Sequence, residues 1–137
     1  MAYWLYKSEP GTWSWDDQVR DGTTFWDGVR NPQANANMKA MQIGDRGFFY
    51  HSGKQKAVVG VVEVVKLWYP DPADETGRYG MVDLKTVGPF PTPVTLAQVK
   101  AEPALADMVL VKNSRLSVQP VTADEWKLVC KMGGYKG

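Results

Sequence analysis

The stretch AVVGVVEVVKL, residues Ala57 to Leu67, decides the fold. Both of its faces are mostly apolar, which predicts a strand that is central to a small barrel or covered on both sides. Gly60 in its middle predicts a bend or a β-bulge, because glycine weakens the interior of a regular strand. The rest of the chain is therefore read as the set of elements that surround this strand.

Before this strand, short strands alternate with capped helices. Ser14 can cap a short helix, and Asn31-Pro32 is a good start for a second helix that ends at Gly44. Asn is a weak helix former, so something other than propensity is expected to hold Asn35 and Asn37 in this second helix. Three strands are expected in this part of the chain, at Ala2–Lys7, Thr23–Trp26 and Asp45–His51.

After the central strand, a turn-rich loop is followed by strands and two helices. Thr95 and Thr122 each open a capping box, and the helix that begins after Thr122 stops at Gly133-Gly134. Further strands are expected at Arg78–Val87, Met108–Val111 and Arg115–Val118. Five or six strands with short flanking helices predict an α+β fold with a small mixed five- or six-stranded β-barrel, in one domain over residues 1–137.

The composition excludes several broad classes of protein. The 137 residues carry a formal net charge of +1, so any phosphate-binding surface has to be a local patch. No apolar run approaches the roughly twenty residues of a membrane span, and the N-terminus lacks a signal-peptide pattern. The single cysteine, Cys130, rules out an internal disulfide and fits a reducing compartment. We therefore expect a protein without a membrane partner, cytoplasmic or, in a eukaryote, nuclear.

Residues that support catalysis or metal binding are sparse. His51 is the only histidine, no serine lies in a G-x-S-x-G elbow, and one His with one Cys cannot close a zinc site. Asp71, Asp74 and Glu75 share a loop that does not match the EF-hand pattern. The chain also has no glycine-rich phosphate loop. We expect no catalysis, no metal and no cofactor.

Aromatic residues are the unusual feature, with six Trp, six Tyr and four Phe. Three segments each end a predicted strand in aromatic and turn-forming polar residues, at Tyr6–Pro10, Phe25–Asn31 and Gly44–Ser52. Such strand ends can converge at one mouth of a barrel, where ligand sites often lie. Aromatic faces stack on a nucleic-acid base and polar groups read its edge, so this chemistry suits a base that has left its stack.

Four motifs in the same order resemble the EVE domain family. They are KSEP at Lys7–Pro10, WDGVRNPQANANM at Trp26–Met38, GDRGFFYHS at Gly44–Ser52 and NSRLSVQPV at Asn113–Val121. The resemblance implies a PUA-like fold related to YTH domains and a role in reading modified bases, with modified cytosine in DNA a leading candidate. It also shows a departure, since many members have an aromatic residue where this chain has Pro32.

The resemblance also implies which residues form the site. Trp26 is similar to the ring on which a YTH domain stacks its base, and Asp27 would offer its backbone N–H or carboxylate to the base edge. The whole predicted base pocket is Lys7, Ser8, Glu9, Trp26, Asp27, Tyr50, His51 and Ser52. The predicted rim or phosphate contacts are Arg30, Asn31, Arg115 and Ser117. A further ring could come from Trp13, Trp68 or Tyr79.

The predicted function is a non-catalytic domain that binds nucleic acid, either DNA or RNA, and accommodates a flipped base with a methylated cytosine or adenine type of modification. One alternative is a PUA-like domain that binds a small molecule or a protein. A second is an enzyme that acts on a nucleobase, with His51 or Glu9 as acid or base. Binding of a free nucleoside without an oligonucleotide would favour the first alternative, and turnover would favour the second.

Overall fold

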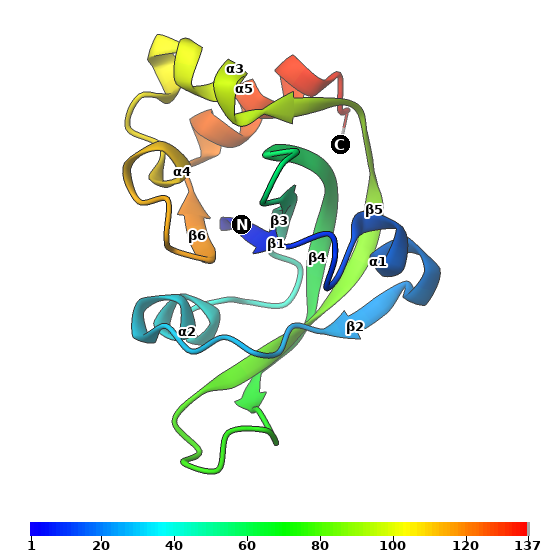
Figure 1. Cartoon of the computed structure of the whole chain (residues 1–137), viewed down its shortest axis with the longest axis vertical. Helices are drawn as coiled ribbons and strands as arrows, with labels where there is room; N and C mark the ends of the chain where they lie inside the picture. The colour runs from blue at the N-terminus through cyan, green and yellow to red at the C-terminus, as the bar shows by residue number, and fades with distance from the viewer. Residues whose placement is uncertain (137) are drawn as a thin grey trace.

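The computed structural model describes residues 1–136, which form one mixed sheet with short helices around it (Figure 1). The sheet has six strands in the order β2-β5-β4-β3-β1-β6. Only the β1–β3 ladder is parallel, and each of the other four ladders is antiparallel. The strands are β1 (Tyr3–Ser8), β2 (Thr23–Phe25), β3 (Arg46–His51), β4 (Ala57–Pro70), β5 (Gly80–Thr95) and β6 (Val118–Val121).

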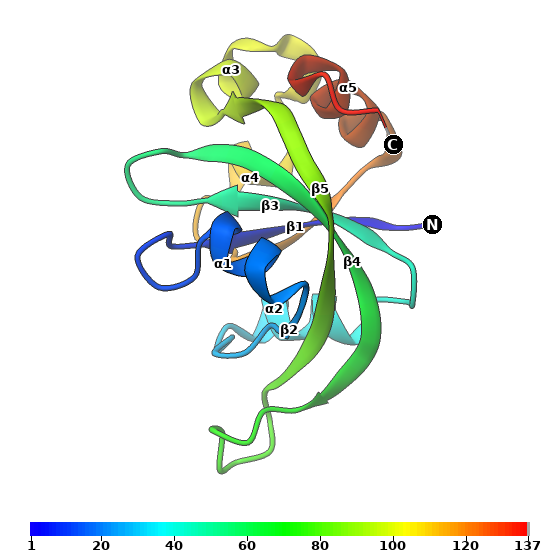
Figure 2. The ribbon, with the colours of Figure 1, turned by 90° about the vertical axis from the view of Figure 1, so that its right-hand side faces the viewer.

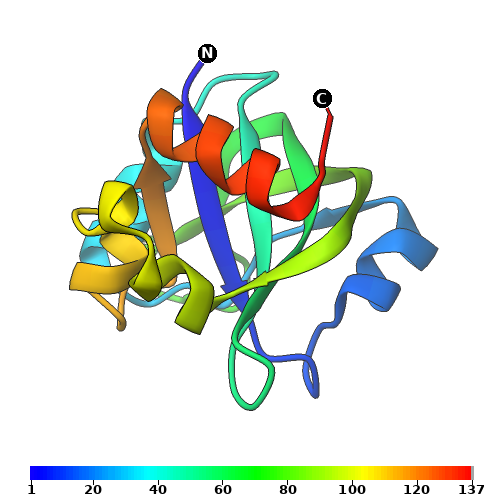
Figure 3. The same cartoon turned by 90° about the horizontal axis from the view of Figure 1, so that it is seen from above.

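The helices gather at two places around the curved sheet. Helices α3 and α5 lie at one end of the molecule, and α1 and α2 lie near β2 and the lower half of β4 and β5 (Figures 1 and 2). Seen from above, α5 crosses over the sheet (Figure 3). The helices are α1 (Trp15–Asp21), α2 (Pro32–Lys39), α3 (Leu96–Ala101), the 3-10 turn η1 (Pro103–Leu105), α4 (Val109–Lys112) and α5 (Ala123–Gly133).

The sheet is buried on both faces around the first part of β4, up to Val64, as the apolar run predicted, whereas residues 65–67 at the end of that run are exposed. Neighbouring residues on a strand point to opposite faces. Accordingly, Phe48 and Val61 join the cluster that α5 covers, whereas Phe49 and Val62 join the cluster that contains residues of α1 and α2. The fold therefore has two cores, one on each side of the sheet.

Gly60 confirms the expected irregularity in the central strand. The β4–β5 register shifts between Val58 and Gly60, and a Cβ at Gly60 would lie 2.4 Å from the ring of Trp15. The missing side chain thus lets an α1 ring sit directly against β4. The α-helical caps are confirmed as well, since Ser14, Thr95 and Thr122 each form a reciprocal capping box.

The two asparagines in α2 are explained by tertiary hydrogen bonds. The Oδ1 atom of Asn35 accepts from Trp68 Nε1 at 2.9 Å and from the backbone N–H of Gly80 at 3.0 Å. The Nδ2 atom of Asn35 donates to the carbonyl of Arg78, and that of Asn37 donates to the carbonyl of Val118. These bonds tie α2 to the β4–β5 hairpin and to β6, which offsets the low helix propensity of Asn.

Three predicted boundaries were wrong. Residues 109–111 of the predicted strand Met108–Val111 belong to α4, because a short apolar run does not distinguish a buried helical turn from a strand. The predicted strand Arg115–Val118 begins only at Val118, where pairing with β1 starts. Helix α2 ends at Lys39 rather than at Gly44, which instead lies in a turn with φ of +90° and donates to the carbonyl of Val64.

Strands β4 and β5 are longer than predicted and form one long hairpin. The ladder continues through several register shifts to Pro70 and Gly80, next to the turn-rich loop. Within residues 1–136 no hydrogen-bonded ladder joins β2 to β6. The curved sheet therefore stays open between these two edge strands and does not close into a continuous barrel. Among these residues no helix has the length and apolar character of a membrane span.

Candidate functional site

A cavity of about 750 Å³ opens where the two edges of the sheet approach each other. One wall comes from the end of β1 and from Ser117 just before β6, and another comes from β2 and the segment that follows it. The lining residues are Lys7, Ser8, Glu9, Thr12, Trp13, Asp21, Thr24, Phe25, Trp26, Asp27, Gly28, Val29, Arg30, Asn31, Pro32 and Ser117. The cavity therefore depends on segments that are distant in sequence.

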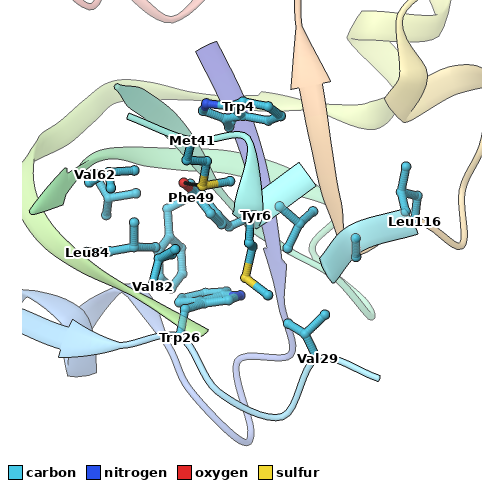
Figure 4. Packing of buried hydrophobic residues seen from close by; sticks show 14 of the residues in the cluster. Trp4, Tyr6, Trp26, Val29, Met41, Phe49, Val62, Val82, Leu84 and Leu116 are labelled. Atoms are coloured by element: carbon cyan, nitrogen blue, oxygen red, sulfur yellow. Dashed lines mark hydrogen bonds between the residues drawn. The ribbon is translucent and has the colours of Figure 1, made fainter. Parts of the chain in front are cut away.

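Trp26 is the most firmly held ring of this lining. It is 8% exposed, and its ring packs edge-on against Tyr6 and Phe49 at centroid distances of 5.5 and 5.6 Å (Figure 4). Its backbone N–H donates to the carbonyl of Val82 at 2.7 Å, which extends the β2–β5 pairing by one residue. A ring fixed in this way loses little conformational entropy when a flat ligand stacks on it.

Trp13 supplies a second indole to the cavity. The indole N–H donates to Gln18 Oε1 at 3.1 Å, and the hydroxyl of Ser8 donates to the backbone carbonyl of Trp13 at 2.5 Å. The guanidinium of Arg20 lies 5.9 Å from the Trp13 ring. Two indoles from separate segments thus line the cavity, whereas Trp68 and Tyr79 lie outside its lining.

A buried carboxylate fixes the segment that carries the rim. Asp71 is 2% exposed and accepts hydrogen bonds from the backbone N–H of Gly28 at 3.0 Å, from Ala73 at 2.9 Å and from the Arg30 guanidinium at 3.1 Å. These bonds, led by that from Gly28, hold the pKa of the Asp71 carboxyl below its usual value. Asp71 does not line the cavity, but it attaches the rim to the β4–β5 hairpin.

Helix α2 begins at the rim, as predicted. Asn31 caps it, since its side chain accepts from the backbone N–H of Ala34 at 2.9 Å, and Pro32 occupies the first turn. Asn31 and Pro32 both line the cavity. The ring of Pro32 therefore forms part of the cavity wall.

Lys7 is a half-buried residue of the opposite wall, but its ammonium is turned toward Tyr50, in the cluster that α5 covers. Its ammonium donates to the carbonyl of Ser114 and lies 5.7 Å from the centre of the Tyr50 ring. Burial lowers the pKa of the Lys7 amine. The backbone N–H of Lys7 donates to the carbonyl of Ser117 at 2.8 Å, which joins this wall to the segment before β6.

The structure brings eight of the twelve predicted site residues to one cavity. These are Lys7, Ser8, Glu9, Trp26, Asp27, Arg30, Asn31 and Ser117. The other four lie outside the lining, and they are Tyr50, His51, Ser52 and Arg115. Their predicted contacts with a ligand find no support in this geometry.

The reasons differ among these four residues. Tyr50 is buried in the cluster under α5, on the other face of the sheet. His51 uses both ring nitrogens internally, since Nε2 accepts from the backbone N–H of Trp15 at 2.9 Å and Nδ1 lies 2.6 Å from Gln55 Oε1. Ser52 pairs through its backbone N–H with the carbonyl of Ser8. Arg115 is exposed outside the cavity.

Sequence reasoning missed several residues of the site and its support. From the sequence, Phe25 has a place at a strand end without a role, and Asp71 is only a member of a loop that does not match the EF-hand pattern. Trp13 was one of three candidates for an extra ring, and nothing in the pattern favoured it over Trp68 or Tyr79. No group of three or more potential metal-ligating side chains is found within residues 1–136.

The fold is shared with a YTH domain. The structure of a YTH domain from Zygosaccharomyces rouxii in complex with N6-methyladenosine RNA matches with a TM-score of 0.61 and 19% identity, over 99% of this chain and 88% of that one. At this identity the match defines the class of fold, which is PUA-like. The particular family follows from a closer match, because the EVE domain model fits residues 2–132. The chain belongs to the EVE domain family.

Several relatives match nearly the whole chain. A protein of Rhodopseudomonas palustris has 60% identity and a TM-score of 0.93, over 98% of this chain and 94% of that one. The human THYN1 protein in complex with DNA that contains 5-methylcytosine has 33% identity and a TM-score of 0.89, over the full length of both chains. By sequence, human thymocyte nuclear protein 1 is 33% identical over 96% of this chain and 73% of its own length.

Proposed function

We propose that the chain is a non-catalytic reader domain that holds one modified nucleic-acid base in the cavity beside Trp26. The observation that carries this proposal is the cavity itself, in which Trp13 and Trp26 come together with polar groups from two sheet edges. Support comes from the relative in complex with DNA that contains 5-methylcytosine, which shares the fold and family.

The lining offers what base recognition needs. Stacking on an indole contributes about 1–3 kcal/mol per base without selecting among bases. Selection then rests on hydrogen bonds to the base edge, for which the wall offers the Asp27 carboxylate, the NH₂ group of Asn31 and the acceptor capacity of the Ser8 hydroxyl, since the Ser8 proton and Asn31 Oδ1 are used inside the fold. A methyl group in an apolar gap adds roughly 1–3 kcal/mol, so we expect about 10- to 100-fold preference for a methylated base.

The charges of the lining predict a weak dependence on salt. Within residues 1–136 the lining has two basic residues, Lys7, whose ammonium is bound to the Ser114 carbonyl, and Arg30, which is paired with Asp71, against the carboxylates of Glu9, Asp21 and Asp27. If binding neutralises about two phosphates, affinity should fall only about tenfold between roughly 50 and 200 mM salt. This balance means that the base in the cavity, rather than the phosphate backbone, provides most of the specificity.

The test is a fluorescence titration with short oligonucleotides that carry one cytosine or adenine, either plain or methylated. We expect one methylated form to bind preferentially, and we expect Trp26→Phe to weaken binding while keeping the ring that packs on Tyr6 and Phe49. Trp13→Ala should lower affinity about tenfold or more, by the loss of one stacking surface. The control is Leu67→Ala, which removes an apolar side chain that is 48% exposed and lies outside the cavity lining.

Three other results would contradict this proposal or support a different function. A folded protein that binds no oligonucleotide at low salt refutes the proposal. Binding of a free nucleoside alone would then support a small-molecule domain. Chemical conversion of a bound nucleoside would support the enzyme alternative, although both ring nitrogens of His51 are already engaged inside the fold.

A further inference from the structure

Phe25 is a large apolar side chain that is exposed at the mouth of the cavity. It is 54% exposed, yet it belongs to the lining and directly precedes Trp26, which is 8% exposed. An exposed ring of this size loses the benefit of burial in the free protein. Its position beside a binding cavity suggests that it becomes buried against a ligand.

The backbone holds Phe25 in a fixed position. Phe25 pairs with Asp83 in the β2–β5 ladder, and the next residue, Trp26, donates its N–H to the carbonyl of Val82. Pairing on both sides of this residue keeps the ring at the sheet edge. A rigid aromatic ring can enter a narrow gap without a large cost in conformational entropy.

The surroundings of Phe25 bear on which part of a nucleic acid it can meet. Asp27 lies two residues further along the lining, and Asp83 is the cross-strand partner of Phe25, so both bring negative charge to this side of the mouth. Carboxylates repel phosphates, whereas the lining cation Lys7 comes from β1 and Arg30, further along the segment of Phe25, pairs with Asp71. Asp83 is itself engaged by the Tyr69 hydroxyl and faces Lys66 in the β4–β5 ladder, so the feature that favours bases at this position is the exposed apolar ring of Phe25 rather than the local charge.

We propose that Phe25 is a wedge that enters the base stack of a duplex at the position vacated by the base held in the cavity. This inference rests on the proposed function. A base that leaves a duplex breaks its pair and its stacking, and apolar side chains inserted between base steps are a known way to offset that loss. The ring of Phe25 would stack on the exposed neighbours of the gap, while Trp26 stacks on the base that left.

A wedge role for Phe25 and a role as part of the cavity wall lead to different expected effects of Phe25→Ala. A wedge contributes only where a duplex has to be opened, so Phe25→Ala should weaken duplex binding far more than binding of a single strand. The probes are one strand that carries a single 5-methylcytosine, the same strand annealed to its complement, and the free nucleoside 5-methylcytidine. Affinities are measured by fluorescence anisotropy for the labelled strands and by tryptophan quenching for the nucleoside.

The expected result is a loss of about tenfold or more for the duplex with Phe25→Ala, and a loss below about twofold for the single strand and the nucleoside. Phe25→Leu should recover part of the duplex affinity, because an aliphatic group can also fill the gap. The matched control is Leu67→Ala, which removes an apolar side chain that is 48% exposed and lies outside the cavity. It should leave all three affinities unchanged.

Equal losses for duplex and single strand would overturn the wedge and make Phe25 part of the cavity wall. Duplex affinity that is unchanged in Phe25→Ala would overturn it as well. Both outcomes leave the proposed function intact, because the wild-type protein still binds the methylated probes. A wild-type protein that binds none of the three probes, and prefers neither methylated cytosine nor methylated adenine in the oligonucleotide titration, refutes the proposed function and the wedge with it.

Discussion

Asp71→Asn tests whether the rim of the cavity is held from the β4–β5 hairpin. The carboxylate of Asp71 accepts two backbone hydrogen bonds, from Gly28 and Ala73, and one from the half-exposed Arg30. Asparagine keeps one acceptor oxygen and turns an NH₂ group toward another donor. One buried backbone N–H therefore loses its partner. Loss of the ion pair with Arg30 adds little to the destabilisation, because the Arg30 side chain is half-exposed.

The loss of stability should be about 1–3 kcal/mol, the usual cost of leaving a buried polar group unpaired. The sign with pH follows from the lowered pKa of Asp71. A carboxyl whose pKa is lower in the folded state stabilises fully above its unfolded value, near pH 4, and this contribution is lost as pH falls through the folded pKa. The difference between wild type and variant should thus be constant near neutral pH and shrink below about pH 4.

The assay is urea unfolding followed by tryptophan fluorescence at neutral pH and near pH 3. Asp107→Asn is the matched control, because it makes the same chemical change at a side chain that is 88% exposed. It should change stability by less than about 0.5 kcal/mol. The reasoning fails if Asp71→Asn is as stable as the control at neutral pH, or if its deficit is as large in acid as at neutral pH.

Three further predictions concern the fold that positions the site. Asn35→Ala removes an amide with three hydrogen bonds to the β4–β5 hairpin and should cost about 2–4 kcal/mol, measured by thermal unfolding. Gly60→Ala should destabilise the protein strongly, because a Cβ there meets the Trp15 ring at 2.4 Å. Gly88→Ala should be nearly neutral, because the nearest atom to its Cβ lies at 3.9 Å. Chemical denaturation of both variants measures the contrast, and equal midpoints would contradict it. Burial raises the pKa of Cys130 to about 11, so iodoacetamide at about pH 8 should label it only after unfolding, and rapid labelling of the folded protein by mass spectrometry would disprove that burial.

Much of the local structure could be predicted because its causes lie within a few residues. Ser14, Asn31, Thr95 and Thr122 begin helices through side-chain bonds to the backbone three residues on, so a short window of sequence contains the whole interaction. The central strand was visible for a similar reason, since a run that is apolar at most positions on both faces requires cover on both faces.

The errors arose where the deciding contacts are distant. A run of four apolar residues at Met108–Val111 fits a strand or a helical turn equally well, and only packing in the core under α5 selects the helix. His51 follows aromatic residues on a strand that points toward the predicted site, but its ring is used by Trp15 and Gln55. A sequence pattern places a strand end near a site without saying which way its side chains are turned.

The sequence alone determined the α+β class, most of the elements, the absence of common catalytic and phosphate-binding motifs, and the segments that carry Lys7–Glu9 and Trp26–Asn31. The tertiary structure decided which of those residues meet, because the curvature of the sheet brings the β2 edge to the β1 and β6 edge across the cavity. It also selected Trp13 over Trp68, placed Phe25 at the mouth and used Asp71 to hold the rim. These choices depend on strand pairing and on hydrogen bonds between distant residues. Gly28 and Asp71, for example, are more than forty positions apart. Local sequence patterns do not encode contacts at such a distance.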